Sequence, residues 1–219
     1  MNRRIDSDRF PEWGPFADAV QRRRPDAGTW CDAWTVRDIV VHQAGNAEEL
    51  ARVLAAHLEG EAIGTRGFDE REGPLRALND ADLWDALLER MAGLGRVAAA
   101  ADEVPRDTDV AWTGRTMKVP WFAEHMREEL VLHGWDITGD DAAARARVRA
   151  PGTEDVVLGA EAGTTTIELA EPEGAATLET DPAAHVLLLW GRKPADPSRI
   201  RSRVGPETLG RVRCLLSGY

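Results

Sequence analysis

The sequence predicts an α+β protein, with a four-helix bundle followed by a small α+β appendage. Apolar residues recur at helical spacing through most of residues 1–140, whereas residues 141–219 contain short alternating segments separated by turn residues. A chain of 219 residues has room for one well-cored domain and a smaller second one. We therefore expect a helical domain over residues 1–140 and an α+β domain over residues 141–219.

The four helices of the bundle are defined by apolar periodicity and by start and stop signals. Pro25 ends the first helix, and Gly139 follows the last. Thr35 and Asp38 have the spacing of a capping box, with Asp in place of the usual Glu, and Asn79 or Asp80 caps the third helix. The helices are expected over residues 12–24, 35–58, 80–101 and 119–137.

The connections and the second domain follow from turn residues and alternation. Residues 60–74 hold four Gly and one Pro and are expected to form a loop, while residues 102–118 are polar and extended around Val110. The second domain is expected to hold two strands, a helix closed by Gly191 and a short final helix. These elements are predicted over residues 164–170, 175–180, 181–190 and 207–216.

Composition and charge narrow the classes of function. The formal net charge of −11 argues against nucleic-acid binding and against binding to anionic membranes. The N-terminal segment lacks the apolar core of a signal peptide, and no apolar run approaches a membrane span. The two cysteines, Cys31 and Cys214, do not suggest a disulfide framework. We therefore expect a cytoplasmic protein.

Two polar residues of the last bundle helix are expected to face the core. A helical projection places Glu129 in the middle of the apolar arc and His133 about 40° from it. A carboxylate in a bundle core costs several kcal/mol unless it is paired, protonated or bound to a metal. Glu129 and His133 therefore form either a buried hydrogen-bonded pair or part of a metal site.

His42 favours the metal site. It lies at the edge of the apolar arc of the second helix, with Asn46 one turn further on. Two imidazoles and one carboxylate suit Zn²⁺ with coordination positions left open. The alternative is that His42 is a half-buried helix histidine.

Two further residues share the face of Glu129. His125 is one turn before it, too far along the axis to join both Glu129 and His133 on a single ion, so it is expected to be an outer or substrate-facing group. Asp136 is three residues after His133 and is a candidate acceptor for the second ring N–H of that histidine. A polar residue in the last turn of the helix is the alternative for Asp136.

At these residues the sequence resembles the DinB-like, mycothiol-dependent maleylpyruvate isomerase family. The resemblance is strongest over residues 30–50 and 116–138. The matching pieces are Cys-Asp-Ala-Trp-Thr-Val-Arg-Asp-Ile-Val-Val-His at 31–42, Arg-Glu-Glu-Leu-Val-Leu-His-Gly-Trp-Asp at 127–136 and Leu-Leu-Leu-Trp-Gly-Arg at 187–192.

The resemblance implies a DinB-like bundle that holds one divalent metal, usually Zn²⁺, through His42, Glu129 and His133. It also implies mycothiol as the thiol cosubstrate, a compound of actinobacteria, which agrees with a chain rich in arginine and alanine. Arg192 matches an arginine of the tail motif and is expected to meet an anionic substrate or the thiol. A salt-bridged surface arginine is the alternative.

The leading hypothesis is an enzyme that activates a low-molecular-weight thiol on zinc and adds it to a small electrophile. His42 and Arg192 are its candidate catalytic residues, and Asn46, His125 and Asp136 are candidates for cofactor binding. Addition can lead to cis–trans isomerisation or to lasting S-transfer in detoxification or specialised metabolism. The rivals are a non-catalytic zinc- or ligand-binding module and a metal-dependent hydrolase. We expect a monomer or a homodimer.

Overall fold

The computed structural model describes the helical part of the chain almost throughout and shorter stretches beyond it. The described residues are 4–31, 33–139, 158–161, 164–167, 178–180, 184, 187–188, 190–193, 195–202 and 206. The chain divides into two compact units, Met1–Ile137 and Thr138–Tyr219.

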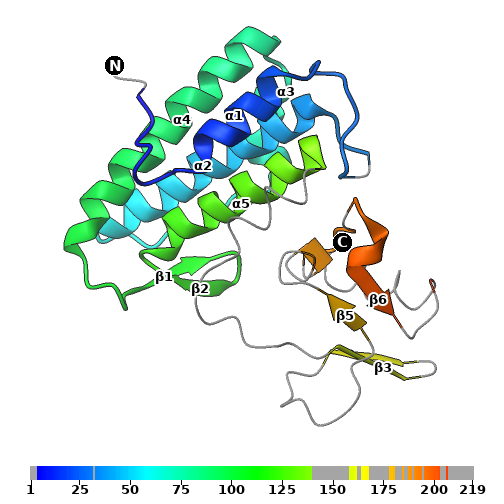
Figure 1. Ribbon diagram of the computed structural model, residues 1–219. Coiled ribbons are helices and arrows are strands. Elements are labelled where there is room, and N and C mark those ends of the chain that lie inside the picture. Colours follow the sequence, from blue (N-terminus) through cyan, green and yellow to red (C-terminus); the bar gives the residue numbers. More distant parts are fainter. Residues whose placement is uncertain are drawn as a thin grey trace. The chain divides into compact units, whose positions relative to one another are not determined.

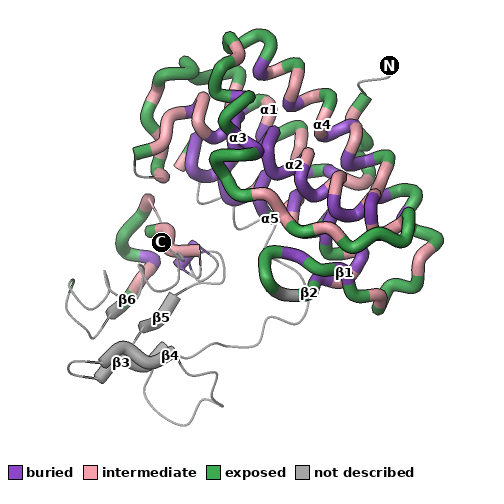
Figure 2. Tube along the Cα trace, turned by 180° about the vertical axis from the view of Figure 1, so that it is seen from behind, coloured by how far each residue is buried: buried purple, intermediate pink, exposed green. Residues whose placement is uncertain are grey.

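Four helices of the first unit lie side by side as a bundle, and a short fifth helix packs beside them (Figure 1). Most residues of helix α2 are buried, as its largely purple trace in Figure 2 shows. The predicted α+β class and four-helix bundle are therefore confirmed. The helices are α1 (Trp13–Gln21), α2 (Val36–Leu58), α3 (Phe68–Arg76), α4 (Asp80–Ala100) and α5 (Trp121–Thr138). The large apolar side chains with no solvent exposure are Phe10, Ile39, Leu50, Leu54, Leu87, Met91, Leu94, Phe122, Met126 and Ile137.

The ends of the helices follow the expected capping chemistry. Thr35 Oγ1 accepts a hydrogen bond from the Asp38 amide at 3.2 Å, and Asp38 Oδ2 accepts one from the Thr35 amide at 3.0 Å. The capping box at the start of α2 is thereby confirmed. Asn79 caps α4 by accepting a hydrogen bond from the Asp82 amide. Helix α1 is shorter than predicted, because it ends at Gln21 and not at residue 24.

The prediction of a loop over residues 60–74 is wrong for its second half, where α3 forms. Gly67 precedes the helix, and two acidic residues occupy its first turn. Leu75 is 1% exposed, and Arg71 and Glu72 are also buried. Gly and Pro within residues 60–74 indicate a loop by local propensity, but packing of a buried face against α2 decides the conformation.

A β-hairpin connects α4 to α5. Strands β1 (Asp109–Trp112) and β2 (Arg115–Lys118) pair in antiparallel register, in agreement with the extended conformation expected around Val110. Thr113 and Gly114, at the turn, both have positive φ, as a type I′ hairpin requires. The short 3₁₀ helix η1 (Ala101–Glu103) continues α4 towards this hairpin.

Among its described residues, the second unit contains two antiparallel strand pairs. Strand β3 (Leu158–Glu161) pairs with β4 (Thr164–Ile167), and β5 (Leu178–Thr180) pairs with β6 (Ile200–Ser202). The two predicted strands are thus present as β4 and β5. Their pairing partners, β3 and β6, were not predicted, because partner choice depends on long-range contacts that alternation does not encode.

The helical expectations for the second unit are only partly covered by the described residues. Ala184, Leu187 and Leu188 are helical, within the helix expected over residues 181–190. The helix expected over residues 207–216 lies outside the described residues. A short 3₁₀ helix, η2 (Pro197–Arg199), precedes β6. None of the described helices is long and apolar enough to cross a lipid bilayer.

A buried carboxylate ties the segment before α3 to α2. The Glu49 side chain has no solvent exposure and forms ion pairs with Arg52 and Arg66. The backbone amide of Arg66 also donates to Glu49 Oε1 at 2.7 Å. Burial raises the pKa of Glu49, but the hydrogen bonds from the two arginines outweigh it and lower the pKa below its usual range.

Replacing Glu49 with Gln is expected to lower the free energy of unfolding by about 2 kcal/mol or more, because two arginines lose their buried partner. In the wild-type protein this contribution is complete above the unfolded pKa of about 4.3 and is lost as pH falls through the lower folded pKa. Denaturant unfolding of Glu49→Gln at several pH values measures both effects. The exposed Glu89→Gln on α4 is the control, and an equal loss in both variants would contradict the assignment.

Candidate metal site

The structure brings together the three residues that the helical projection selected. His42 of α2 and Glu129 and His133 of α5 place one ligand atom each within 4.8 Å of one another. Both imidazole Nε2 atoms face the same carboxylate oxygen, with Glu129 Oε2 at 3.3 Å from His42 and 3.2 Å from His133. All three residues are buried, with exposed fractions of 7%, 6% and 3% in chain order.

A second carboxylate lies beside the Nδ1 atom of each imidazole, on the side of the ring away from Glu129. His42 Nδ1 lies 2.9 Å from Glu72 Oε1, and His133 Nδ1 lies 2.9 Å from Asp136 Oδ2. His42 Nδ1 forms a hydrogen bond with Glu72, whereas His133 Nδ1 lies at ion-pair distance from Asp136. In a neutral ring with its proton on Nδ1, each Nε2 would be available as a ligand on the side of Glu129. This carboxylate–histidine arrangement is typical of metal-ligating histidines.

Asp136 takes the position that its spacing from His133 suggests, but Glu72 was missed by sequence reasoning. Glu72 lies on α3, within residues that were expected to form a loop. The signal that could have found it is the spacing of Phe68, Glu72 and Leu75, which repeats at four and three residues and defines one face of a short helix. Gln43 was also missed, and its Nε2 donates to Glu129 Oε2 at 3.4 Å.

Aromatic rings enclose the two imidazoles. The Trp34 ring stacks on His133 at 5.6 Å between centroids and meets His42 edge-on at 5.1 Å. Phe68 of α3 lies 5.7 Å from His42 and is itself half-exposed. Aromatic rings therefore cover part of the site, and Phe68 is the one of them that is largely exposed to solvent.

The charges of the site are mutually dependent. Burial opposes ionisation of Glu129, yet its contacts with His133 and His42 lower its pKa well below the usual range. Burial likewise lowers the pKa of His133, but Asp136 and Glu129 outweigh it and raise that pKa to about 9. The carboxylates thus favour positive charge at the position between the two rings.

The donor set fits a divalent metal ion. Two imidazole nitrogens and one carboxylate oxygen are the ligands of many catalytic zinc sites, in which one or two positions are open to water or substrate. Three carboxylates, those of Glu72, Glu129 and Asp136, surround the two imidazoles. A bound dication would neutralise part of their negative charge, which protons on the imidazoles balance in its absence.

Two other predicted residues lie beside this group but outside it. His125 is half-buried, with its Nε2 3.9 Å from Glu129 Oε1, and its ring meets Trp112 at 6.0 Å. His125 is not one of the three residues whose ligand atoms lie within 4.8 Å of one another, and its role as an outer or substrate-facing group stays a prediction. Asn46 is 2% exposed, and its Nδ2 has no hydrogen-bond partner among the described residues.

Arg192 belongs to the second unit. Its Nη1 donates to the carbonyl oxygen of Trp190 at 2.8 Å, and its side chain is half-buried. Its catalytic role stays a prediction.

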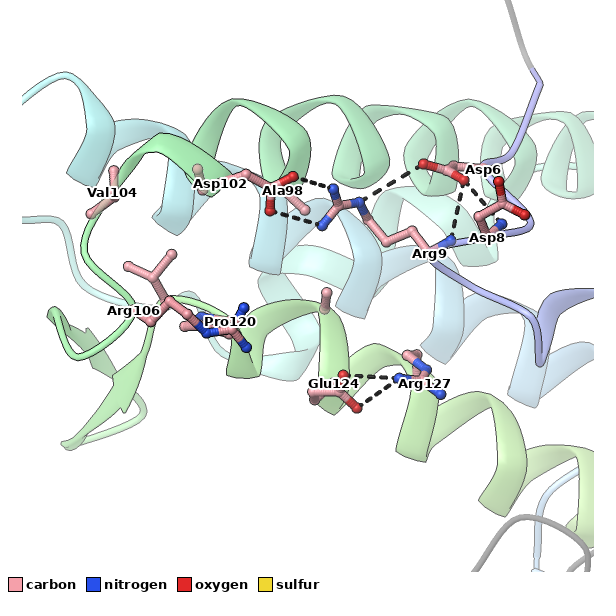
Figure 3. Close-up of a pocket in the computed structure, with 13 residues that line it drawn as sticks. Asp6, Asp8, Arg9, Ala98, Asp102, Val104, Arg106, Pro120, Glu124 and Arg127 are labelled. Carbon is pink, nitrogen blue, oxygen red and sulfur yellow. Dashed lines mark hydrogen bonds and ion pairs between the residues drawn. The ribbon is translucent and has the colours of Figure 1, made fainter. Parts of the chain in front are cut away.

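A separate hollow of about 530 Å³ lies between the N-terminal segment, the end of α4 and the start of α5 (Figure 3). It contains none of the predicted site residues. Arg9 pairs with Asp102 at 2.6 Å, and Arg127 pairs with Glu124 at 2.9 Å. Because its charged side chains are largely paired with one another, this hollow is a weaker candidate than the buried histidine–glutamate group.

The fold and this group define a helical bundle with a candidate open metal site. The sequence model of the mycothiol maleylpyruvate isomerase N-terminal domain matches residues 11–138, more than half of the chain. The chain therefore belongs to this family.

Solved structures agree with the fold. Crystal structures of the mycothiol-dependent maleylpyruvate isomerase and of a histidine-to-alanine mutant of it superpose with TM-scores of 0.66 and 0.67. Each is 16% identical to this chain, and the alignment covers 92% of this chain and 95% of the other. No curated relative matches the sequence significantly.

Replacing Glu72 with Gln is expected to weaken zinc binding by about tenfold or more, because His42 loses the charged acceptor that orients its ring. Zinc affinity measured by competition with a chromogenic chelator tests this. Glu70→Gln, on the exposed side of the same helix, is the matched control. An unchanged affinity in Glu72→Gln would show that Glu72 does not support a metal ligand.

Zinc binding is expected to release about one proton near pH 7, because a pKa of about 9 keeps His133 protonated in the metal-free protein and a ligating imidazole must be neutral. The apparent affinity should therefore fall as pH is lowered from 9. Calorimetric titration in two buffers with different ionisation enthalpies measures the proton count. Binding heats that do not depend on the buffer would contradict this account.

Proposed function

We propose that this protein is a zinc-dependent enzyme that activates a low-molecular-weight thiol, mycothiol, for addition to a small electrophile. The observation that carries the proposal is the convergence of His42, Glu129 and His133, with each imidazole backed by a carboxylate. Membership of a family named for a mycothiol-dependent isomerase supports the choice of thiol.

A divalent ion in this site would supply the positive charge that keeps an incoming thiol deprotonated at neutral pH. The chain's own residues would orient the metal ligands, exclude water and accept a proton. Glu72 and Asp136 fix the tautomer and orientation of the two imidazoles, and the aromatic wall of Trp34 and Phe68 limits the access of water. We assign to His125, which is half-buried and has its Nε2 3.9 Å from Glu129 Oε1, the role of proton acceptor for the substrate.

This chemistry does not require a nucleophile from the protein, since the thiol itself attacks the electrophilic carbon. If the thiol later leaves, the net result is cis–trans isomerisation; if it stays, the result is S-transfer. Both outcomes share the same activation step. We take Arg192 as a candidate for contact with an anionic substrate, and we place the enzyme in the cytoplasm as a monomer or homodimer.

Metal analysis combined with titration of mycothiol tests the class of the protein. We expect about one zinc per chain and a thiol-dependent spectral change in the cobalt-substituted protein. A zinc-binding module without catalytic function would hold metal but show no thiol affinity. Absence of a bound divalent metal would overturn the proposal.

Replacing His42 with Ala is expected to abolish zinc binding and thiol-dependent activity together, because only two ligands would remain. The control is His57→Ala on the same helix, which should keep full zinc content, since His57 lies outside the ligand group. Full activity in His42→Ala would rule out the assignment.

Product analysis separates the two reactions: an isomerised substrate indicates isomerase, and a stable thiol adduct indicates S-transferase.

A further inference from the structure

One arginine outside the candidate metal site links two parts of the first unit. Arg23 follows α1, and its Nη1 donates to the carbonyl oxygen of Ile137 at 2.9 Å, while its Nη2 donates to that of Gly28 at 3.0 Å. Ile137 lies in the last turn of α5, the helix that carries two of the candidate metal ligands. Gly28 begins the pre-α2 loop (residues 28–31 and 33–34). One guanidinium therefore joins this loop to the end of α5.

The pre-α2 loop itself also donates to the end of α5. The backbone amide of Trp30 donates to the carbonyl oxygen of Asp136 at 2.7 Å. The last four carbonyl groups of an α-helix lack a partner within the helix, and a positive charge near them is favourable. Trp30 and Arg23 supply donors to two of these carbonyls, those of Asp136 and Ile137. The end of α5 is thereby fixed to the loop that precedes α2.

The pre-α2 loop is tightly folded and ends at Trp34. The carbonyl oxygen of Trp34 accepts hydrogen bonds from the Thr29 amide at 3.1 Å and from the Thr29 hydroxyl at 3.0 Å. The Trp34 amide donates to the carbonyl oxygen of Cys31 at 3.1 Å. Ala33 has a φ of 66°, in the left-handed region that a residue with a Cβ rarely adopts, and such a conformation persists where the surrounding contacts impose it. The loop therefore determines where the Trp34 side chain lies.

The Trp34 ring contacts both imidazoles of the candidate metal site. It is nearly parallel to the His133 ring, with 5° between the two planes and 5.6 Å between the centroids, and it meets the His42 ring edge-on at 5.1 Å. The two imidazole planes are inclined at 68° to each other. Offset-stacked and edge-to-face contacts are the favoured geometries of ring pairs. One indole therefore restrains both imidazole planes, and with them the directions in which the two Nε2 atoms point.

We propose that Arg23 and Trp34 are positioning residues for the candidate metal site. Arg23 holds the pre-α2 loop against the end of α5, and Trp34 holds the two imidazoles in the planes that direct both Nε2 atoms at a common ion. Neither side chain supplies a ligand, so both act through His42 and His133. The inference rests on the proposed function only for the presence of the metal, because the contacts that restrain the rings do not depend on an ion.

The zinc affinity of the full-length protein, measured by competition with a chromogenic chelator, tests the role of Trp34. We expect Trp34→Leu to weaken zinc binding by about tenfold, because both imidazoles gain rotational freedom, and Trp34→Phe to recover most of the affinity. The matched control is Trp84→Leu, which removes a half-buried indole from a stacked pair with Trp13. Wild-type affinity in Trp34→Leu, or an equal loss in Trp84→Leu, would overturn the proposal.

A double-mutant cycle tests the role of Arg23. Arg23→Met should weaken zinc binding by about threefold or more, whereas Arg22→Met, at the exposed neighbour that pairs with Asp18, should bind zinc as wild type does. Because Arg23 acts through Trp34, the double variant should bind zinc no more weakly than Trp34→Leu alone. Additive losses, or unchanged affinity in Arg23→Met, would contradict this role. Arg23 is exposed, so its variant keeps the test available if Trp34→Leu does not fold.

Proton NMR of the metal-free protein separates this inference from the proposed function. The ring current of Trp34 should displace the resonances of the carbon-bound ring protons of His133, because the two rings are stacked. This displacement should be lost in Trp34→Leu, reduced in Arg23→Met and kept in Arg22→Met. A protein that shows these shifts and binds no zinc would keep the positioning residues and remove the zinc chemistry. Zinc binding without these shifts would remove the positioning residues and leave the proposed function standing.

Discussion

The site depends on the burial of a carboxylate inside a helical bundle. Glu129 is held in the core of the first unit, where a bare negative charge is strongly unfavourable. The Nε2 atoms of His42 and His133 lie next to the Glu129 carboxylate and stabilise its charge, and Gln43 donates a hydrogen bond from its side-chain amide. Because these partners come from both α2 and α5, the relative position of the two helices is tied to the charge balance of the site.

Charge alternates outward from Glu129 in successive layers. The two imidazoles surround it, Glu72 and Asp136 lie behind the imidazoles, and Arg76 pairs with Glu72 at the surface. Each layer makes the one inside it less costly to bury, and the layers together give a position that favours a cation. Helix α3 belongs to this arrangement, since it supplies Glu72 as well as the aromatic rim residue Phe68.

Much of the site could be predicted from the sequence because it rests on helical geometry. Glu129, His133 and Asp136 are related by spacings of four and three residues on one helix, and His42 lies on the core-facing shoulder of another. Glu72 was missed because Gly73 and Pro74 indicate a loop and so mask the helical spacing of its segment, which tertiary packing stabilises as a helix.

The strand pairs of the second unit were not predicted for a related reason. Alternation shows that a segment is a strand, whereas its partner is chosen by contacts distant in sequence. Asn46 Nδ2 and Arg71 Nε have no hydrogen-bond partner among the described residues, and the spacing of residues in the sequence cannot predict this, because it depends on which groups the folded chain brings together.

X-ray absorption at the zinc edge, recorded before and after addition of mycothiol, tests the central claim most directly. The account predicts a metal bound only by nitrogen and oxygen in the resting protein, with imidazole scattering from two rings. After addition of the thiol, a sulfur neighbour should appear at about 2.3 Å. A coordination shell that does not change when the thiol is added would contradict it.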